Sequence, residues 1–290
     1  QNKPIVWTMH DMWPCTGICH HARDCEKFQT ECESCFFLKS KGKDLSTSVF
    51  DKKMSLYKDA NITFVGCSRW LSGRAKKSYL LRGKAVLSIP NPIDTKVYHP
   101  MDQGMARELL GLPLGKRLLL FGALNVTDKR KGIDYLIEAL RRMEKQDVEL
   151  VVFGQVKDDI RGLFPVPIHS MGYLSDESKI VALYNAVDMF ITSSLEENLP
   201  NTIMESMACG TPCVGFEIGG IPEMIDHRVN GYVANYKDAG DLANGIQWVL
   251  EHEDRLALSD ACVKKVQENY TEEVVAKQYT ALYEKLLKGE

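Results

Sequence analysis

The chain has 290 residues and a formal net charge of −3 at pH 7, with 44% hydrophobic and 26% charged residues. These values are typical of a globular protein with one large domain or two ordinary ones. The slightly acidic balance gives no reason to expect a nucleic-acid partner. No apolar run approaches the roughly 18 residues that a membrane-spanning helix needs.

Apolar segments rich in Val, Ile and Leu alternate along the chain with segments of helical periodicity. This alternation predicts parallel βαβ units with helices on both faces of a sheet. The expected strands are 4–9, 62–67, 85–89, 117–122, 148–153, 167–171, 189–193, 212–216 and 231–234. The expected helices include 132–144, 177–186, 200–209, 239–252 and Glu272–Lys288.

Three prolines, Pro90, Pro92 and Pro100, indicate a linker near residues 90–100. The stretch from about 100 to 270 contains enough βα units for a complete doubly wound domain, whereas residues 1–89 contain only about three strands. We therefore expect a first domain at 1–92, a second at 93–275 and a C-terminal helix at 276–290. Because the chain begins with Gln1 and reaches an apolar strand almost at once, we expect a piece of a longer protein.

The most informative segment runs from Ser193 to Glu205, where the carboxylates Glu197 and Glu205 flank a predicted strand-to-helix junction. Pro200 suits the first turn of that helix. Helical spacing places Asn198, Asn201, Thr202 and Glu205 on one face and Ile203, Met204 and Met207 on the other. Open α/β sheets bind ligands beyond the carboxyl ends of their strands, and the N–H groups of a helix start suit a phosphate. The alternative is an ordinary solvated face.

This segment resembles the E-x7-E signature of retaining GT-B glycosyltransferases of family 4. Other segments resemble the same family in the same order: Ile89–Asp94, Lys131–Gly132, Gly172–Asp176, Gly219–Glu223 and Asn230–Tyr232. The resemblance covers nearly all of 85–290. It implies an α/β GT-B fold of two Rossmann-like, doubly wound parallel-sheet domains, the first of them truncated, because the family's N-terminal glycine-rich loop is missing here.

The resemblance also implies roles for individual residues. His10 and Glu197 would lie at the donor sugar and the reacting centre, and Glu205 would bind the nucleotide ribose. The other implied donor-binding residues are Arg130, Lys131, Gly172, Tyr173, Leu174, Asn198, Leu199, Asn201 and Thr202. The family usually places an arginine directly after the glycine that ends the first strand of this domain. Here Gly122 is followed by Ala123, so the second phosphate contact stays open between Lys129 and Arg130.

By the same resemblance, the protein transfers a sugar with retention from a UDP or GDP donor to a glycan or lipid-linked acceptor. The process would be synthesis of a bacterial surface polysaccharide, in the cytoplasm or at the inner face of the membrane, with no cofactor for catalysis. A nucleotide-sugar-binding scaffold of the same fold without turnover is the main alternative. Another Rossmann-like enzyme is less consistent with the sequence, because neither G-x-G-x-x-G nor G-x4-G-K-[ST] is present.

Five of the nine cysteines fall between residues 15 and 35, and Cys32 and Cys35 have the C-x2-C spacing of a metal knuckle. Cys19 and Cys25 would complete a four-thiolate set, which favours structural zinc, with His20 or His21 as substitutes. Disulfides and free thiols are the competing interpretations, and a cytoplasmic location disfavours disulfides.

A basic cluster around a predicted helix is either a solvated face or a contact with an anionic bilayer. Its members are Arg74, Lys76, Lys77, Arg82 and Lys84.

Overall fold

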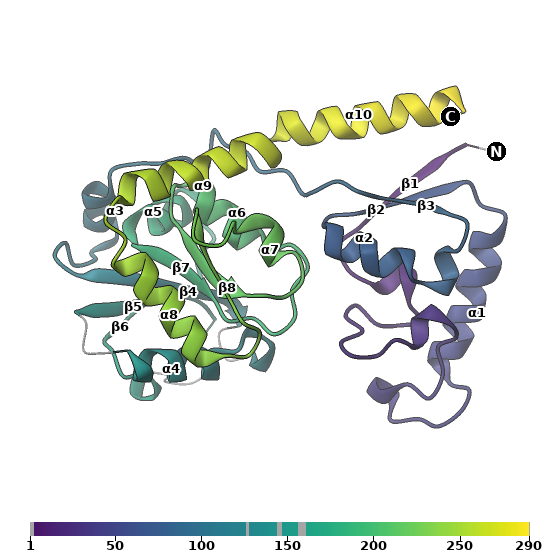
Figure 1. Ribbon diagram of the computed structural model, residues 1–290, viewed down its shortest axis with the longest axis horizontal. Helices are drawn as coiled ribbons and strands as arrows, with labels where there is room; N and C mark the ends of the chain where they lie inside the picture. Colours follow the sequence, from purple (N-terminus) through teal and green to yellow (C-terminus); the bar gives the residue numbers. More distant parts are fainter. Residues whose placement is uncertain (1–2, 126–127, 144–146, 156–160, 290) are drawn as a thin grey trace. The chain divides into compact units, whose positions relative to one another are not determined.

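The computed structural model describes residues 3–125, 128–143, 147–155 and 161–289. The chain forms two compact units (Figure 1). Unit 1 consists of Gln1–Asn91 together with Val275–Glu290, and unit 2 consists of Pro92–Val274. Within the described ranges, no helix is both long enough and apolar enough to cross a membrane.

Unit 1 is built on a three-stranded parallel sheet in the order β1-β2-β3. Its strands are β1 (Ile5–Met9), β2 (Ile62–Gly66) and β3 (Ala85–Ser88), and its helices are α1 (Leu45–Lys58), α2 (Arg69–Lys76) and most of α10 (Glu272–Lys288). The segment between β1 and α1 has no strand and contains the 3₁₀ turns Trp13–Cys15, Lys27–Gln29 and Phe36–Leu38. Irregular backbone thus carries the cysteine cluster.

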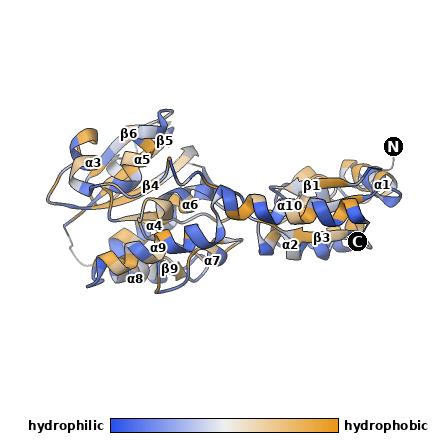
Figure 2. Cartoon of the chain, turned by 90° about the horizontal axis from the view of Figure 1, so that it is seen from above, coloured by the Kyte–Doolittle hydropathy of each residue, from blue (hydrophilic) through white to orange (hydrophobic). Residues whose placement is uncertain are grey.

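The C-terminal helix α10 packs on the sheet of unit 1 through an apolar stripe. Val275 and Leu282 are buried against Val65 of β2 and Ile89. Tyr279 adds a polar contact, because its Oη lies 2.9 Å from the Thr8 hydroxyl oxygen of β1. Hydrophobic and hydrophilic residues alternate along this helix, as Figure 2 shows, which is the pattern of a helix with one buried face.

Unit 2 contains a six-stranded parallel sheet in the order β6-β5-β4-β7-β8-β9. The chain starts in the middle of the sheet, runs outward to β6, and then returns to the other side of β4. Its strands are β4 (Arg117–Asn125), β5 (Val148–Gln155), β6 (Ile168–Gly172), β7 (Met189–Thr192), β8 (Cys213–Phe216) and β9 (Gly231–Ala234). This order is that of a doubly wound Rossmann-like sheet, with its topological switch point between β4 and β7.

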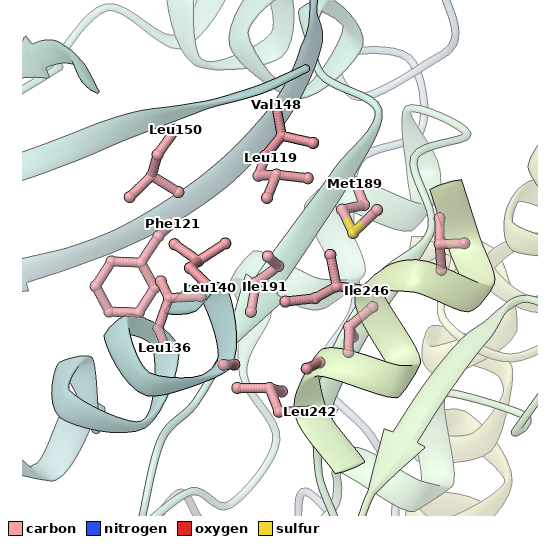
Figure 3. Packing of buried hydrophobic residues seen from close by; sticks show 14 of the residues in the cluster. Leu119, Phe121, Leu136, Leu140, Val148, Leu150, Met189, Ile191, Leu242 and Ile246 are labelled. Atoms are coloured by element: carbon pink, nitrogen blue, oxygen red, sulfur yellow. The ribbon is translucent and has the colours of Figure 1, made fainter. Parts of the chain in front are cut away.

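Helices cover both faces of this sheet. They are α3 (Gln103–Leu110), α4 (Ile133–Arg142), α5 (Glu177–Ala186), α6 (Asn201–Ala208), α7 (Ile221–Met224), α8 (Ala239–Leu250) and α9 (Arg255–Asn269). On one face α4 and α8 pack together, and Leu136 and Leu242 lie against Phe121 and Ile191 (Figure 3). Helices α3, α5, α6 and α9 pack in sequence on the other face, where Tyr184 meets Phe190 edge-on.

Every strand predicted from the sequence is present, with ends displaced by a few residues, and the α/β fold class is confirmed. The largest displacement is at β4, which was expected to end at Gly122 but continues through a register shift to Asn125. Gly122 is therefore an interior glycine, and its role is packing: a Cβ there would lie 1.8 Å from the Phe153 ring. The connection from β4 to Lys131 is correspondingly shorter than expected.

Candidate functional site

Three loops of unit 2 meet at the carboxyl ends of the adjacent strands β4, β7 and β8. The first contains the 3₁₀ turn Lys129–Lys131, the second runs from Ser193 to Pro200, and the third contains Gly219 and Gly220. Because β4 and β7 flank the switch point, their connections leave in opposite directions, and open α/β sheets bind ligands at such a point. The structure thus brings Lys131 and the predicted E-x7-E segment to the position where such sheets bind ligands.

Lys131 and Glu197 form an ion pair across this switch point. The Lys131 Nζ donates to Glu197 Oε1 at 2.6 Å, and the exposed fractions of the two side chains are 33% and 14%. The main chain fixes the pair: the Ser193 hydroxyl donates to the Lys131 carbonyl oxygen at 3.0 Å, and the Leu195 N–H donates to the Arg130 carbonyl oxygen at 2.7 Å. Two residues assigned separately from the sequence are thus direct partners.

Two glycines allow the loops to approach this closely. Gly132 has φ +65°, and a Cβ there would lie 1.9 Å from the Ser193 carbonyl oxygen. Gly219 has φ +58°, and a Cβ there would lie 2.1 Å from the Glu197 carbonyl oxygen. The Gly220 N–H donates to the Asn198 carbonyl oxygen. The loop that carries Glu197 is therefore held from both sides, and any side chain at Gly132 or Gly219 would displace it.

Helix α6 begins directly after this loop, and its own residues divide into the two predicted faces, whereas Asn198 lies before the helix and is buried. Ile203, Met204 and Met207 are at most 1% exposed, whereas Asn201 is exposed and Thr202 and Glu205 are half-buried. Pro200 occupies the N-cap position and provides no side-chain cap. The start of α6 therefore presents main-chain N–H groups near Lys131, an arrangement that suits an anion.

Glu205 lies one turn further along α6 in a partly enclosed polar position. Its Oε2 accepts a hydrogen bond of 2.8 Å from the hydroxyl of Tyr184, which is itself 1% exposed. Burial raises the pKa of Glu205, the hydrogen bond from Tyr184 lowers it, and the nearby carboxylate of Glu177 raises it. A carboxylate held where its charge is unfavourable is typical of a binding site more than of a structural ion pair.

The remaining donor-site predictions stay predictions. The guanidinium of Arg130 forms an ion pair with the carboxylate of Asp128 at 2.6 Å. Hydrogen bonds from Arg130 lower the pKa of Asp128. Asn198 and Leu199 are each 7% exposed, so any contact with a ligand would come from their main chain. Gly172 is the last residue of the edge strand β6, two strands from β4, and Tyr173 and Leu174 follow it; Tyr173 is 62% exposed.

His10 lies in unit 1 and follows directly after β1. Its side chain is exposed. The adjacent Asp11 accepts hydrogen bonds of 2.7 Å from the Trp13 N–H and from Nδ1 of His20. The carboxyl end of β1 is thus polar, as predicted, and the catalytic role of His10 stays a prediction.

The four cysteines predicted to bind zinc lie in the segment of unit 1 between β1 and α1. Burial and then the thiols of Cys35, Cys32 and Cys25 raise the pKa of Cys19 to about 12. The Gly17 N–H donates to Cys32 Sγ at 3.3 Å. All nine cysteines are free thiols. No group of three or more His, Cys, Asp or Glu side chains among the described residues is arranged as it stands to hold a metal ion.

The sequence did not single out Tyr184, the hydrogen-bond partner of Glu205. Tyr184 lies within the predicted helix 177–186, where an aromatic residue is expected to be part of the core, and its ring does pack on Phe190. The contact joins residues 21 positions apart on different helices, so no local pattern indicates it. The close approach of Gly219 to Glu197 is a second missed feature, for which the signal was the Gly-Gly pair itself.

A family model and several curated proteins match parts of this chain. The family model described as "Glycosyl transferases group 1" matches residues 115–252, a span that contains Lys131, Glu197 and Glu205. N-acetyl-alpha-D-glucosaminyl L-malate synthase of Bacillus anthracis is 24% identical over 213 residues, which are 71% of this chain and 55% of that protein.

A second relative is N,N'-diacetylbacillosaminyl-diphospho-undecaprenol alpha-1,3-N-acetylgalactosaminyltransferase of Campylobacter jejuni. It is 33% identical over 118 residues, which are 40% of this chain and 31% of that protein. The chain therefore spans about half, or less, of the length of these relatives.

Among solved structures, Anabaena HepE in complex with UDP has a TM-score of 0.74 at 19% sequence identity, with 97% of this chain and 72% of that chain covered. This likeness supports the fold: an α/β protein with Rossmann-like parallel sheets of the GT-B type. The family match covers residues 115–252, a little under half of the chain, and this span contains the strands β4, β7 and β8 at whose carboxyl ends the site lies.

Proposed function

We propose that this chain binds a nucleoside-diphosphate sugar and takes part in its transfer, with retention, to a glycan or lipid-linked acceptor in bacterial surface-polysaccharide synthesis. The observation that carries the proposal is the Lys131–Glu197 ion pair at the switch point of unit 2, beside the start of α6. Two relatives support the donor and acceptor classes. HepE was crystallised with UDP, and the Campylobacter transferase is named for a diphospho-undecaprenol-linked acceptor.

The proposed chemistry follows from the charges at this site. The bond between the anomeric carbon and the diphosphate oxygen breaks, which leaves positive charge on the sugar and negative charge on the phosphate. Lys131 and the N–H groups at the start of α6 would stabilise that negative charge. Glu197, whose carboxylate already contacts Lys131, would accept hydrogen bonds from the donor sugar. Glu205 would accept hydrogen bonds from the ribose hydroxyls.

The test is calorimetry with UDP, GDP, ADP and their sugars, followed by a transfer assay with lipid-linked and oligosaccharide acceptors. Lys131→Ala should weaken nucleotide binding by about tenfold to a hundredfold, because it removes a charge-assisted hydrogen bond. Arg142→Ala is the matched control, since Arg142 also pairs with a carboxylate, that of Glu138, but lies at the far end of α4. Absence of binding by every nucleotide contradicts the proposal. Binding without transfer to any acceptor favours the scaffold alternative.

We also propose that Cys19, Cys25, Cys32 and Cys35 bind one structural zinc ion. The support is the C-x2-C spacing of Cys32 and Cys35 and the N–H···S hydrogen bond from Gly17 to Cys32. Four thiolates are a donor set that suits zinc. The ion would draw the thiols into a closed set and would stabilise a segment that has few regular hydrogen bonds of its own.

A further inference from the structure

A loop of unit 1 exposes three consecutive large hydrophobic side chains. Phe36, Phe37 and Leu38 form a 3₁₀ turn, and their exposed fractions are 52%, 43% and 39%. Single exposed hydrophobic residues are ordinary on protein surfaces, but a contiguous group of them indicates an interaction site.

The loop is held in one shape by hydrogen bonds at its base. The Ser34 N–H donates to the Gly42 carbonyl oxygen at 2.8 Å, and the Gly42 N–H donates to the Ser34 hydroxyl oxygen at 2.8 Å. Inside the loop, the Asp44 carboxylate accepts hydrogen bonds from the Cys35 N–H and from the Ser40 hydroxyl. The hydrophobic side chains are thus presented by a preorganised loop, which lowers the entropy lost when it binds.

Positive charges surround the hydrophobic tip. Lys39, Lys41 and Lys43 are exposed and follow the three hydrophobic residues directly. The Arg23 guanidinium lies 5.7 Å and 5.4 Å from the ring centres of Phe36 and Phe37. The acidic residues of this segment lie away from the three lysines in the sequence: Asp24, Glu26, Glu31 and Glu33 precede the tip, and Asp44 is occupied by hydrogen bonds at the base of the loop.

The basic cluster that the sequence suggested for a bilayer contact is less suited to that role. The Arg74 guanidinium lies 4.8 Å from the ring centre of Phe28, and the Arg74 side chain is only 18% exposed. The Lys84 Nζ donates to the carbonyl oxygens of Lys58 and Ala60. Two of its five cations are therefore used within unit 1, whereas the three lysines of the loop are exposed.

We propose that the loop Phe36–Lys43 docks unit 1 on an anionic lipid surface. Phe36, Phe37 and Leu38 enter the boundary between headgroups and acyl chains, where aromatic rings are favoured. Lys39, Lys41 and Lys43 contact the lipid phosphates. The charge complementarity between the lysines and an anionic headgroup layer selects this partner. The proposal does not depend on the function proposed above.

The experiment is co-sedimentation of the protein with phosphatidylcholine vesicles that contain or lack phosphatidylglycerol. We expect binding only where phosphatidylglycerol is present, and weaker binding at higher salt. The variant F36S/F37S/L38S should lose at least about tenfold in vesicle affinity. K39E/K41E/K43E should lose roughly a hundredfold, because each lysine near the surface contributes several-fold to binding.

The matched control is M105S/L109S/L256S, which removes three exposed hydrophobic side chains of unit 2 that are 65%, 65% and 72% exposed. It should sediment as the unchanged protein does. Thermal unfolding of all variants identifies any loss of folding. If F36S/F37S/L38S does not fold, K39E/K41E/K43E still tests the proposal, because it changes only exposed side chains. Equal sedimentation of F36S/F37S/L38S and the unchanged protein would overturn the proposal. A dimer that these serines dissociate, with no vesicle binding, would overturn it in favour of a contact between copies.

Discussion

Glu205 lies at the candidate site, where burial disfavours its charged form. Its effect on folding stability can therefore be measured separately from its proposed role in binding UDP. Its pKa is raised by burial, so the folded state holds a proton there more tightly than the unfolded chain does. The folded state therefore loses stability as pH rises through the pKa of Glu205 in the folded protein. Glu205→Gln removes that charge and keeps an oxygen that can accept from Tyr184.

We expect Glu205→Gln to unfold at the same or a higher temperature than the unchanged protein at pH 7, and to lose about tenfold in UDP affinity. Scanning calorimetry and titration calorimetry measure the two quantities. Glu138→Gln, at a carboxylate that is paired and 43% exposed, is the control and should change neither. A lower melting temperature with unchanged UDP affinity would show that Glu205 is structural.

Glu197 competes with any phosphate for Lys131, because the two side chains are paired in the ligand-free protein. Glu197→Gln weakens that competition and removes a negative charge next to the phosphate position. We expect the affinity for UDP to rise by about fivefold, corresponding to roughly 1 kcal/mol, while transfer of sugar is lost. Titration calorimetry and the transfer assay check the two results. Weaker UDP binding in this variant would contradict the assigned geometry.

At the scale of elements, a buried charge network fixes β4 and β7 at the end opposite the candidate site. The Asp188 side chain is 2% exposed and accepts from the Leu118 N–H at 2.7 Å and from the guanidinium of Arg107 at 3.1 Å. Arg107 also donates to the carbonyl oxygens of Ala186, Leu114 and Lys116. The network joins helix α3 to the first residues of two neighbouring strands.

We expect Asp188→Asn to lower the free energy of unfolding by about 3–5 kcal/mol, because Arg107 is left as an uncompensated buried cation. Denaturant unfolding measures the change. The control is Asp147→Asn, which breaks the exposed pair with Lys116 and should cost less than about 1 kcal/mol. Equal effects in the two variants would refute the structural role of the buried pair.

The cysteine segment between β1 and α1 gives a prediction about metal content. Protein purified without added metal should contain about one equivalent of zinc, and Cys32→Ser should release it and lower the melting temperature. Elemental analysis provides the measurement. Cys209→Ser, at a buried thiol of unit 2, is the control and should leave the zinc content unchanged. Metal-free protein that melts at the same temperature as protein with added zinc would end the proposal.

The strands were predictable because each contains an apolar run of the length of a buried strand. The repeating βα pattern then indicated the fold class. The end of β4 was not predictable, because the register shift after Gly122 depends on pairing with β5 and does not change the apolar pattern of the sequence. Helix α9 was not among the helices named from the sequence, and only Leu258, Cys262 and Val266 of its residues are buried. A stripe of three residues is too sparse a signal in a mostly polar segment.

The candidate site was predictable to a similar degree. Lys131, Glu197 and Glu205 were singled out by the resemblance of their segments to family motifs and by their positions after predicted strands. The structure pairs Lys131 with Glu197 and places Glu205 on α6, which follows β7, while their donor-binding roles stay predictions. The Lys131–Glu197 pair and the Tyr184–Glu205 hydrogen bond depend on tertiary contacts, and such contacts leave no periodic signal in the sequence.

At the scale of the whole molecule, the two units divide the proposed tasks. Unit 2 contains Lys131, Glu197 and Glu205 and hence the proposed nucleotide site, whereas unit 1 contains His10, the cysteine cluster and the exposed loop Phe36–Lys43. The helix α10 ends the chain with a stripe that packs on β2 of unit 1. Donor binding and contact with a lipid surface are therefore separable by mutation.

The most direct test of the central claim is a crystal structure of the chain with UDP bound. The account predicts the diphosphate against Lys131 and the start of α6, with the ribose hydroxyls within hydrogen-bond distance of Glu205. A separate cavity of about 240 Å³ lies at the other end of the sheet and is lined by residues that include Asn185, Asp188 and Arg255. UDP in that cavity, or anywhere away from the carboxyl ends of β4, β7 and β8, would contradict the account.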